Sequence, residues 1–398
     1  MTAIPFRFSF QILAILGIIP FFISCTKNEQ HALAETSSIE KSVLWEKGKG
    51  NYNNYRIPSI IVTKKGTVLA FCEGREAGDS GDIDILMKSS KDNGKTWSES
   101  KVVWGDAQNS CGNPCPVVDQ ETGRILLVVT WNNGKDDEGE IINKTSSAPR
   151  KPYLLYSDDD GENWSAPVDI SATTREDSWG WYATGPGVGI QIKDGKYKGR
   201  LVIPANHSYD DPEGNLRGGP YAYGAHVLYS DDHGKNWTKS ASIQPGCNES
   251  QVTALSDGTL LMNMRSYNDQ YSRAISTSTD GGETWSAIQH DYQLVESKVQ
   301  ASILEYGDFE GRNLHLFVNP AVPKGRTHLT LKASFDDCKT WTNSKLVYAG
   351  PSAYSCLTRL PNGNVGLFLE HGEKSPYEYM TFISFDPKEI FSTGALMD

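Results

Sequence analysis

Three arginines stand in or beside strand-like runs, and together they could act on a negatively charged ligand. Arg56 lies in Tyr-Arg-Ile-Pro, Arg265 in Asn-Met-Arg-Ser, and Arg326 in Gly-Arg-Thr-His-Leu-Thr-Leu. The guanidinium fork binds a carboxylate through two parallel hydrogen bonds, and arginine is rarely buried without a partner. Taken singly, each arginine is typical of a surface or salt-bridged residue. If the three converge in one central channel, they predict a clamp for a carboxylate.

Such convergence requires a fold that brings distant segments together, and a repeated phrase indicates one. The phrase Ser-x-Asp-x-Gly-x-Thr/Asn-Trp recurs at Ser90–Trp97, Ser157–Trp164, Ser230–Trp237, Ser278–Trp285 and Ser334–Trp341. Recurrence at intervals of about 50 to 70 residues indicates one supersecondary unit repeated around a centre. Long helical periodicity is absent. We therefore expect a single all-β domain with the architecture of a β-propeller.

Each copy of the phrase has the chemistry of a β-hairpin turn. The Asp is expected to accept hydrogen bonds from backbone N–H groups two residues on, and the Gly supplies a positive-φ position. The Trp ring anchors the turn against its own sheet. These Asp residues are therefore interpreted as structural. In the last copy Cys338 stands where Gly is expected, so we predict a distorted turn there.

Short β-rich runs alternate with turn residues along the rest of the chain. The predicted strands are Ile57–Thr63, Val68–Cys72, Arg124–Trp131, Tyr153–Ser157, Leu201–Ala205, Ala225–Ser230, Leu260–Met264, Leu314–Val318, His328–Ser334, Val365–Glu370 and Tyr379–Phe385. Two longer irregular stretches, residues 132–150 and 209–221, could line a binding site or be surface insertions. The cluster Trp179-Gly180-Trp181-Tyr182 could form a sugar-binding wall or pack inside a blade.

Composition and cysteine spacing exclude several functions. The net charge of −11 lacks the positive footprint of a nucleic-acid-binding protein. The pair Cys111-x-x-x-Cys115 has no second pair at zinc spacing, so we do not expect a metal site. No cofactor is implied. We expect the cysteines after the leader to be mostly buried free thiols, and the protein to be a monomer.

The N-terminus has the features of an export signal. Arg7 precedes an apolar run from Phe8 to Ile23, and Cys25 follows directly, as in a bacterial lipoprotein box. We predict a signal peptide over residues 1–25 with lipidation at Cys25, a polar tether over 26–44, and a catalytic domain over 45–398. Plain secretion or a retained anchor are the alternatives. The predicted location is the bacterial cell envelope, as an outer-membrane lipoprotein or a periplasmic or extracellular protein.

From about Trp45 to Phe391 the chain resembles the bacterial exo-α-sialidases, or neuraminidases. Tyr55-Arg56-Ile57-Pro58 matches the family's Arg-Ile-Pro signature, and the five repeated phrases match its Asp boxes. Further matching segments, in family order, are Gly81–Asp84, Thr184–Ile190, Arg200–His207 and Asn248–Gln251. The resemblance implies a six-bladed β-propeller. It also implies release of terminal α-linked sialic acid, a sugar with a carboxylate on its anomeric carbon, from sialylated glycans.

The resemblance also implies a role for each candidate site residue. The sialate carboxylate would be held by Arg56, Arg265 and Arg326. Glu370, in Leu-Phe-Leu-Glu, would hold Arg56 in place. The sugar hydroxyl near C4 would be contacted by Arg75 and Asn113.

The implied chemistry uses a tyrosine nucleophile, as sialidases do in place of the usual second carboxylate. Tyr354 would attack the anomeric carbon, and Glu249 would be its base, because a free phenol has a pKa near 10. A neutral phenol avoids the repulsion that a carboxylate would meet at this carbon. Asp79, on a short glycine-containing loop, would be the general acid/base. Asp82 is its rival, whereas Asp84 is interpreted as structural. The configuration at the anomeric carbon would be retained.

Two other functions remain open from the sequence. A trans-sialidase would pass the sialyl group to a sugar or to an intramolecular hydroxyl rather than to water. A non-catalytic Asp-box propeller would only bind carbohydrate or assemble with partners. Loss of Tyr354, Glu249 or a clamp arginine would favour this last possibility, and all of them are present.

Overall fold

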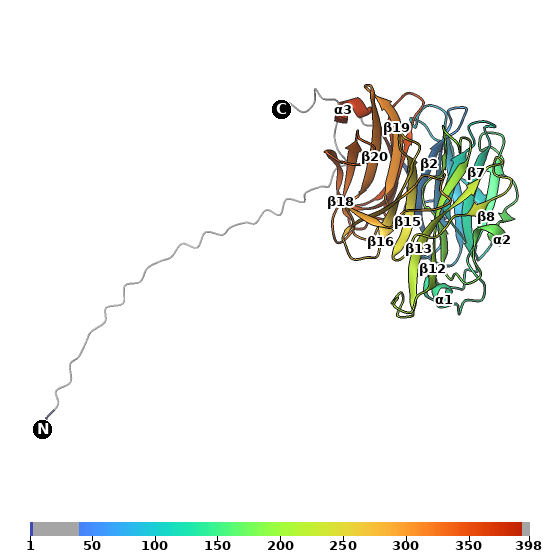
Figure 1. Ribbon diagram of the computed structural model, residues 1–398. Helices are drawn as coiled ribbons and strands as arrows, with labels where there is room; N and C mark the ends of the chain where they lie inside the picture. Colours follow the sequence, from blue (N-terminus) through green and yellow to red (C-terminus); the bar gives the residue numbers. More distant parts are fainter. Residues whose placement is uncertain (3–39, 392–398) are drawn as a thin grey trace. The chain divides into compact units, whose positions relative to one another are not determined.

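The computed structural model describes residues 1–2 and 40–391, and these form a predominantly β structure (Figure 1). The strands are β1 Glu40–Glu46, β2 Asn54–Val62, β3 Val68–Arg75, β4 Ile83–Ser90, β5 Lys101–Trp104, β6 Ser110–Val118, β7 Ile125–Asn132, β8 Lys151–Ser157, β9 Val168–Asp169, β10 Tyr182–Thr184, β11 Ile190–Gln191, β12 Leu201–Asp210, β13 Tyr221–Ser230, β14 Thr238–Lys239, β15 Cys247–Ala254, β16 Leu260–Ser266, β17 Ser272–Ser278, β18 Gln289–Val295, β19 Ser302–Phe309, β20 Arg312–Pro320, β21 Thr327–Ser334, β22 Asn343–Arg359, β23 Val365–His371 and β24 Tyr379–Phe385. The short helices are α1 Glu138–Ile142, α2 Ser171–Thr174 and α3 Pro387–Phe391. Within the described residues, every helix is too short or too polar to cross a membrane.

Each strand predicted from the sequence overlaps an observed one, but several observed strands extend further; β12, for example, runs on to Asp210 and does not end at Ala205. The predicted signal peptide and its Cys25 lie outside the described residues. The predicted tether lies only partly outside them, because β1 begins at Glu40. The domain therefore begins before the predicted boundary at residue 45.

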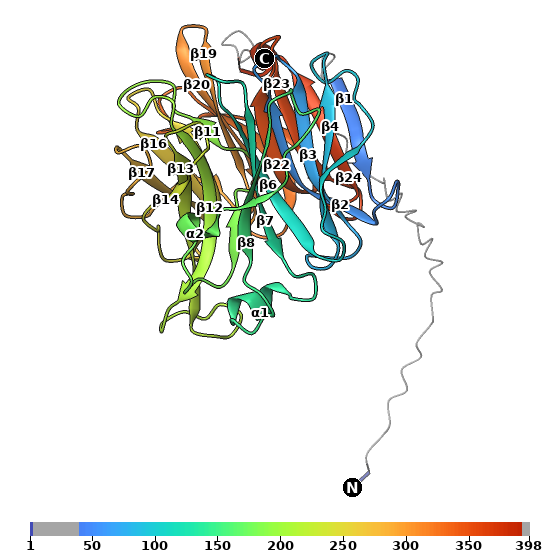
Figure 2. The same ribbon diagram turned by 90° about the vertical axis from the view of Figure 1, so that its right-hand side faces the viewer.

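Strands that follow one another in the sequence pair antiparallel, as successive hairpins (Figure 2). The successive groups are β2–β5, β6–β9, β10 with β12–β14, β15–β18, β19–β21 with the first half of β22, and the second half of β22 with β23, β24 and β1. The last group draws on both ends of the described domain. In it, Glu40 of β1 pairs with Ser384 of β24, and Glu46 pairs with Tyr379.

The core lies between neighbouring groups, because alternate side chains of a strand point to opposite faces. Val68 and Ala70 of β3 pack with Phe368 of β23. Leu69 and Phe71 of the same strand pack instead against β7 and β8 of the following group. One strand therefore contributes to two cores, which fixes the position of each group relative to its neighbours.

The Asp boxes form five turns with one hydrogen-bond pattern. In the first, Ser90 Oγ accepts from Gly94 N at 2.8 Å, and Asp92 Oδ1 accepts from Thr96 N at 2.9 Å. The carboxylate therefore accepts from the residue four positions on, not two positions on as predicted. These hydrogen bonds lower the pKa of Asp92 to about 2, led by those from Thr96. All five aspartates accept a backbone hydrogen bond within their own turn, as their structural interpretation requires.

The prediction of a distorted last turn is wrong. Cys338 N donates to Ser334 Oγ at 3.0 Å, and Thr340 N donates to Asp336 at 2.9 Å, as in the other copies. Cys338 adopts the left-handed backbone conformation, with φ of +62°, that glycine adopts elsewhere. The hydrogen bonds of the turn thus hold a non-glycine residue in a conformation that it rarely adopts alone. The cysteines of the described residues, Cys338 included, are free and buried, as predicted.

A buried histidine pair lies between β12 and β13, beneath part of the predicted aromatic cluster. His207 Nδ1 and His226 Nδ1 are 2.9 Å apart, and the Trp179 ring stacks on His207 at 3.7 Å. Trp179 and Tyr182 are both buried here, so these two members of the cluster pack in the interior. Burial lowers the pKa of His226 to about 3 and that of His207 well below its usual value, and the charge of Lys239 adds to both shifts.

This pair predicts loss of stability in acid. Both histidines titrate near pH 6.5 in an unfolded chain, so below that pH the unfolded state binds more protons than the folded one. The free energy of unfolding should therefore fall below about pH 6.5, by at most about 1.4 kcal/mol per pH unit for each histidine, down to about pH 3 for His226. Urea midpoints measured between about pH 7 and 4 should decline less steeply in His226→Gln. The exposed-site control His328→Asn should keep the wild-type slope, and an unchanged slope in His226→Gln would contradict the assignment.

Candidate active site

Most of the predicted site residues line one cavity of about 640 Å³. They are Arg56, Arg75, Asp79, Asn113, Glu249, Arg265, Arg326 and Tyr354. The remaining one within the described residues, Glu370, is fully buried and contacts Arg56 directly. Residues separated by about 300 positions in the sequence thus meet in one place, as the clamp hypothesis requires.

The three predicted clamp arginines are held in different ways. Arg56 Nε donates to Glu370 Oε1 at 2.7 Å, and Arg265 Nη1 donates to Glu249 Oε2 at 2.7 Å. Arg326 has no carboxylate partner among the described residues and donates to the hydroxyl of Tyr377 at 2.6 Å. Arg326 therefore keeps a positive charge that a ligand carboxylate could neutralise. Tyr377, which the sequence did not indicate, also places its ring 4.0 Å from the Arg56 guanidinium.

Tyr354 and Glu249 form a buried hydrogen-bonded pair beside this clamp. Tyr354 Oη donates to Glu249 Oε1 at 2.6 Å, and Arg265 Nη1 lies 3.2 Å from the same phenol oxygen. Burial and the negative charge of Glu249 raise the pKa of Tyr354 well above its usual value, against the lowering effect of the arginines. The phenol is therefore neutral in the free protein, with a proton acceptor already in contact.

Glu370 joins the clamp to the tyrosine. One of its carboxylate oxygens accepts from Arg56 Nε and from Ile57 N, the latter at 2.8 Å. The other accepts from the backbone N–H of Tyr354 at 3.1 Å. One carboxylate therefore ties Arg56 to the backbone of the residue that carries the phenol.

Asp79 lies at the rim of the cavity with its side chain 84% exposed. Its carboxylate pairs with Arg75 and lies 3.9 Å from Arg56 Nη1. Desolvation alone would raise the pKa of Asp79, but the charges of Arg75 and Arg56 outweigh it and hold that pKa below its usual value. Asp82 does not line the cavity. Asp84 accepts from the Tyr52 hydroxyl at 2.5 Å, in keeping with its structural interpretation.

Arg75 and Asn113 are placed by a buried carboxylate that sequence reasoning missed. Arg75 Nε donates to Glu73 Oε2 at 2.7 Å, and Asn113 N donates to Glu73 Oε1 at 2.6 Å. Arg150 completes the cluster by donating to Asn113 Oδ1 at 2.6 Å. The lining of the cavity therefore carries two guanidinium groups besides those of the three clamp arginines.

The backbone aims these side chains through breaks in strand register. The breaks lie between Arg56 and Ser59 in β2, Gly112 and Cys115 in β6, Cys247 and Ser250 in β15, and Ser352 and Ser355 in β22. Each contains or borders a predicted site residue, and a β-bulge is a device that redirects a side chain. At the first break Ile57 has φ of +64°, which is an outlier for a β-branched residue.

The two irregular stretches both reach the cavity. Residues 132–150 contain α1 and contribute Glu138, and residues 209–221 contribute Leu216 and Arg217. Arg217 pairs with Glu138 and so ties the two stretches together. Trp181, the remaining aromatic residue of the predicted cluster, lines the cavity with its ring 4.4 Å from the Arg150 guanidinium.

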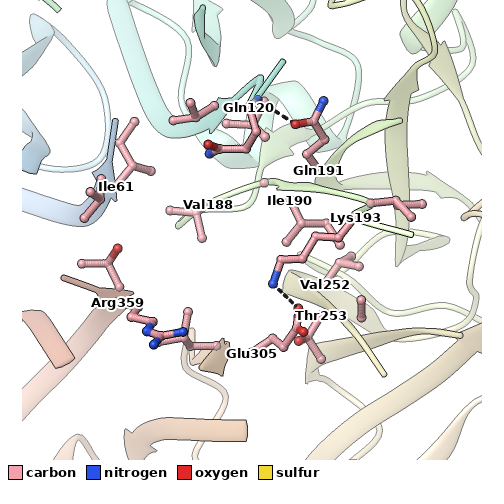
Figure 3. A pocket seen from close by; sticks show the side chains of 18 of the residues that line it. Ile61, Gln120, Val188, Ile190, Gln191, Lys193, Val252, Thr253, Glu305 and Arg359 are labelled. Carbon is pink, nitrogen blue, oxygen red and sulfur yellow. Dashed lines mark hydrogen bonds and ion pairs between the residues drawn. The ribbon is translucent and has the colours of Figure 1, made fainter. Parts of the chain in front are cut away.

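A second cavity, of about 460 Å³, contains none of the predicted site residues (Figure 3). Its lining is largely aliphatic, including Ile61, Val188 and Val252. Lys193 forms an ion pair with Glu305 at 2.9 Å across it. Its lining lacks the cluster of arginines and the buried phenol that make the first cavity a candidate active site.

Comparison with known proteins shows a matching family. Residues 24–367 match the family model described as BNR repeat-like domain. A sialidase of Bacteroides fragilis is 30% identical over 369 residues, which cover 86% of this chain and 64% of that protein. The chain thus spans less than two thirds of that relative's length.

Solved structures give the same fold. The Hadza microbial sialidase Hz136 has a TM-score of 0.72 and 29% identity, covering 85% of this chain and 67% of that one. A leech intramolecular trans-sialidase has a TM-score of 0.75 and 21% identity, covering 88% and 71%. The fold is therefore the all-β sialidase fold, and the chain belongs to the bacterial exo-sialidases of the BNR-repeat type.

Proposed function

We propose that this protein is an exo-α-sialidase that hydrolyses terminal α-linked sialic acid from sialylated glycans, with retention of configuration. The observation that carries the proposal is the 2.6 Å hydrogen bond from Tyr354 Oη to Glu249, in a cavity that also holds Arg56, Arg265 and Arg326. These groups supply a neutral nucleophile, its base and a carboxylate clamp around one space. No cofactor is part of the proposal.

In the first half of the reaction, the sialate carboxylate binds the three arginines. Tyr354 Oη forms a bond to the anomeric carbon while its proton passes to Glu249. The bond from that carbon to the glycosidic oxygen breaks, and Asp79 gives a proton to the leaving oxygen. In the second half, Asp79 takes a proton from water, the water oxygen attacks the anomeric carbon, and Tyr354 leaves with the proton held by Glu249. Two displacements at one carbon give net retention.

The charges of the cavity support a phenol nucleophile. The anomeric carbon already bears a carboxylate, so an attacking carboxylate would be repelled by it, whereas the Tyr354 phenol is neutral until it reacts. Arg265 lies 3.2 Å from the phenol oxygen and would stabilise negative charge as it develops. Substrate binding would also offset the arginine charges that hold down the pKa of Asp79, which favours its protonated, acidic form.

We also propose that the domain is a six-bladed β-propeller. Each of the successive strand groups would be one blade, with β22 shared between two blades and β1 closing the last. The packing of β3 against groups on both sides supports this arrangement, because radially stacked blades bury both faces of each sheet.

The experiment that tests the function is an NMR time course of the purified protein with α2,3- and α2,6-sialyllactose. Initial release of α-sialic acid would establish a retaining sialidase, and the two rates would give the linkage preference. A transferred or anhydro product would identify a trans-sialidase instead. A folded protein that yields no product from either sialoside would favour the non-catalytic binding module.

Arg326 offers the cleanest test of the clamp, because its partner is a hydroxyl and not a catalytic carboxylate. Arg326→Ala should weaken the binding of free sialic acid by about 10- to 100-fold, the effect of losing a charge-assisted hydrogen bond. Calorimetric titration would measure the Kd. Arg124→Ala is the matched control, since Arg124 pairs with Asp158 away from the cavity. Equal affinities of Arg326→Ala and wild type would exclude Arg326 from the clamp.

Lipidation at Cys25 and a place in the bacterial cell envelope remain proposals supported by the sequence of the leader. Mass spectrometry of the membrane fraction would test them, since a lipid-modified N-terminal Cys25 peptide is expected there. The monomeric state likewise remains a prediction.

A further inference from the structure

A third cavity, of about 320 Å³, is lined in part by Ser266 and Gly325, the chain neighbours of the clamp residues Arg265 and Arg326. The Tyr267 ring lies 5.0 Å from the Arg265 guanidinium and 5.4 Å from Lys298 Nζ. Tyr267 lines the active-site cavity, and Lys298 lines the third one. A residue of the active-site cavity therefore contacts a residue of the third one.

Three chain segments surround this third cavity, and two of them come directly from clamp arginines. Asp269 and Tyr271 lie in the turn that follows β16, the strand of Arg265. Lys324 lies in the turn between β20 and β21, two residues before Arg326. Lys298 follows β18. If a bound glycan extends from the clamp toward this cavity, its inner sugars pass over these segments.

The lining has the chemistry of a carbohydrate site. Tyr271 is 48% exposed, and an exposed aromatic face can bind the C–H face of a sugar ring. Asp269 and Lys298 form an ion pair at 2.6 Å, so their charges compensate and their polar atoms can bond to hydroxyl groups. Lys324 has no ion-pair partner among the described residues and adds free N–H donors.

The backbone holds this arrangement in uncommon conformations. Asp269, Tyr271 and Lys298 have φ of +55°, +51° and +58°, although none is glycine. The Tyr271 carbonyl accepts from Glu296 N at 3.1 Å, which ties the turn to the segment that carries Lys298. The main chain at Tyr271 is thus held against the segment that carries Lys298.

We propose that this cavity binds an inner, neutral sugar of an extended glycan whose terminal sialic acid occupies the active site. The protein would therefore cleave extended sialoglycans faster than short ones with the same terminal linkage. This inference rests on the proposed sialidase function and identifies Tyr271 as a specificity-determining residue.

The test compares α2,3-sialyllactose with a pentasaccharide that has the same sialyl-galactose end and two further neutral sugars. In the wild type, kcat/KM should be about fivefold higher for the pentasaccharide, the size expected of one ring-stacking contact. Tyr271→Asn, which tolerates a positive φ, should abolish most of this ratio while changing kcat/KM for sialyllactose by less than about twofold. Tyr292→Ala is the matched control, because Tyr292 is 67% exposed and does not line the cavity.

Three results would overturn the proposal. They are equal wild-type kcat/KM values for the two substrates, an equal loss on both substrates in Tyr271→Asn, and a loss of the ratio in Tyr292→Ala as well. Titration with the neutral tetrasaccharide that lacks sialic acid, followed by NMR, separates this inference from the proposed function. Binding that is lost in Tyr271→Asn would support the sugar site even if neither sialoside were cleaved, whereas absence of binding to the wild type would count against it.

Discussion

Tyr354→Phe is expected to lower kcat on sialyllactose by about 10³-fold or more, the scale of effect seen when a nucleophile is removed. The substitution deletes only the phenol oxygen. Glu249 then keeps its ion pair with Arg265 at 2.7 Å, and the clamp arginines keep their other partners. The Kd for free sialic acid should therefore stay within about tenfold of wild type, since the fold and the carboxylate contacts remain.

Turnover and affinity should be measured on the same preparation of Tyr354→Phe. Tyr377→Phe is the matched control, since Tyr377 also contacts a clamp arginine, donating no bond to Glu249 but accepting one from Arg326. It should retain most of kcat and lose mainly affinity. Near-wild-type turnover in Tyr354→Phe would show that another group attacks the anomeric carbon.

Asp79→Asn should have an effect that depends on the leaving group. Cleavage of sialyllactose should slow by about 10²- to 10³-fold, because its sugar alkoxide needs a proton to leave. An aryl sialoside, whose phenolate leaves without protonation, should lose about tenfold or less. The measurement is kcat/KM for both substrates over a range of pH. The pKa of Asp79 is held below its usual value in the free protein, so the fraction of protein with a protonated Asp79 decreases from low pH upward. The value of kcat/KM for sialyllactose should decrease with that fraction.

Asp82→Asn is the control for this assignment. Asp82 lies on the same loop but does not line the cavity, so its replacement should affect the two substrates equally and weakly. A large loss confined to sialyllactose in Asp82→Asn, with Asp79→Asn unaffected, would exchange the two roles.

The sequence predicted some strands of this fold much better than others. β3, β7 and β23 were recognised because their apolar residues are numerous and are bounded by turn residues. β6, β15 and β22 were missed, although the cavity residues Asn113, Glu249 and Tyr354 lie on them. These strands contain Pro, Gly, Asn, Ser and Glu in place of aliphatic residues, and their register is broken where the site residues lie. Because these strands carry site residues in place of aliphatic ones, they lack the apolar pattern by which a strand is recognised in a sequence.

The site residues were identified through the resemblance to sialidases, and the arginine pattern alone indicated only a possible clamp. The partners that hold them could not be predicted. Glu73 and Tyr377 lie in ordinary strand and turn contexts, and their importance arises from contacts with residues far away in the sequence. The prediction of a distorted turn at Cys338 was wrong for the opposite reason. Local propensity argued against the conformation, whereas the hydrogen bonds from Ser334 and Asp336 stabilise it.

The pairing of β1 with β24 has a consequence for how the protein folds. β1 is the first described strand to be synthesised, and its partner is almost the last, because Glu40 pairs with Ser384. During synthesis, β1 must wait with its backbone groups unpaired until the C-terminal hairpin has emerged. Contacts of such large sequence separation form slowly, and an unpaired strand is prone to aggregation meanwhile. The final, cooperative step of folding is therefore expected to be the docking of the N-terminal strand onto an otherwise complete domain.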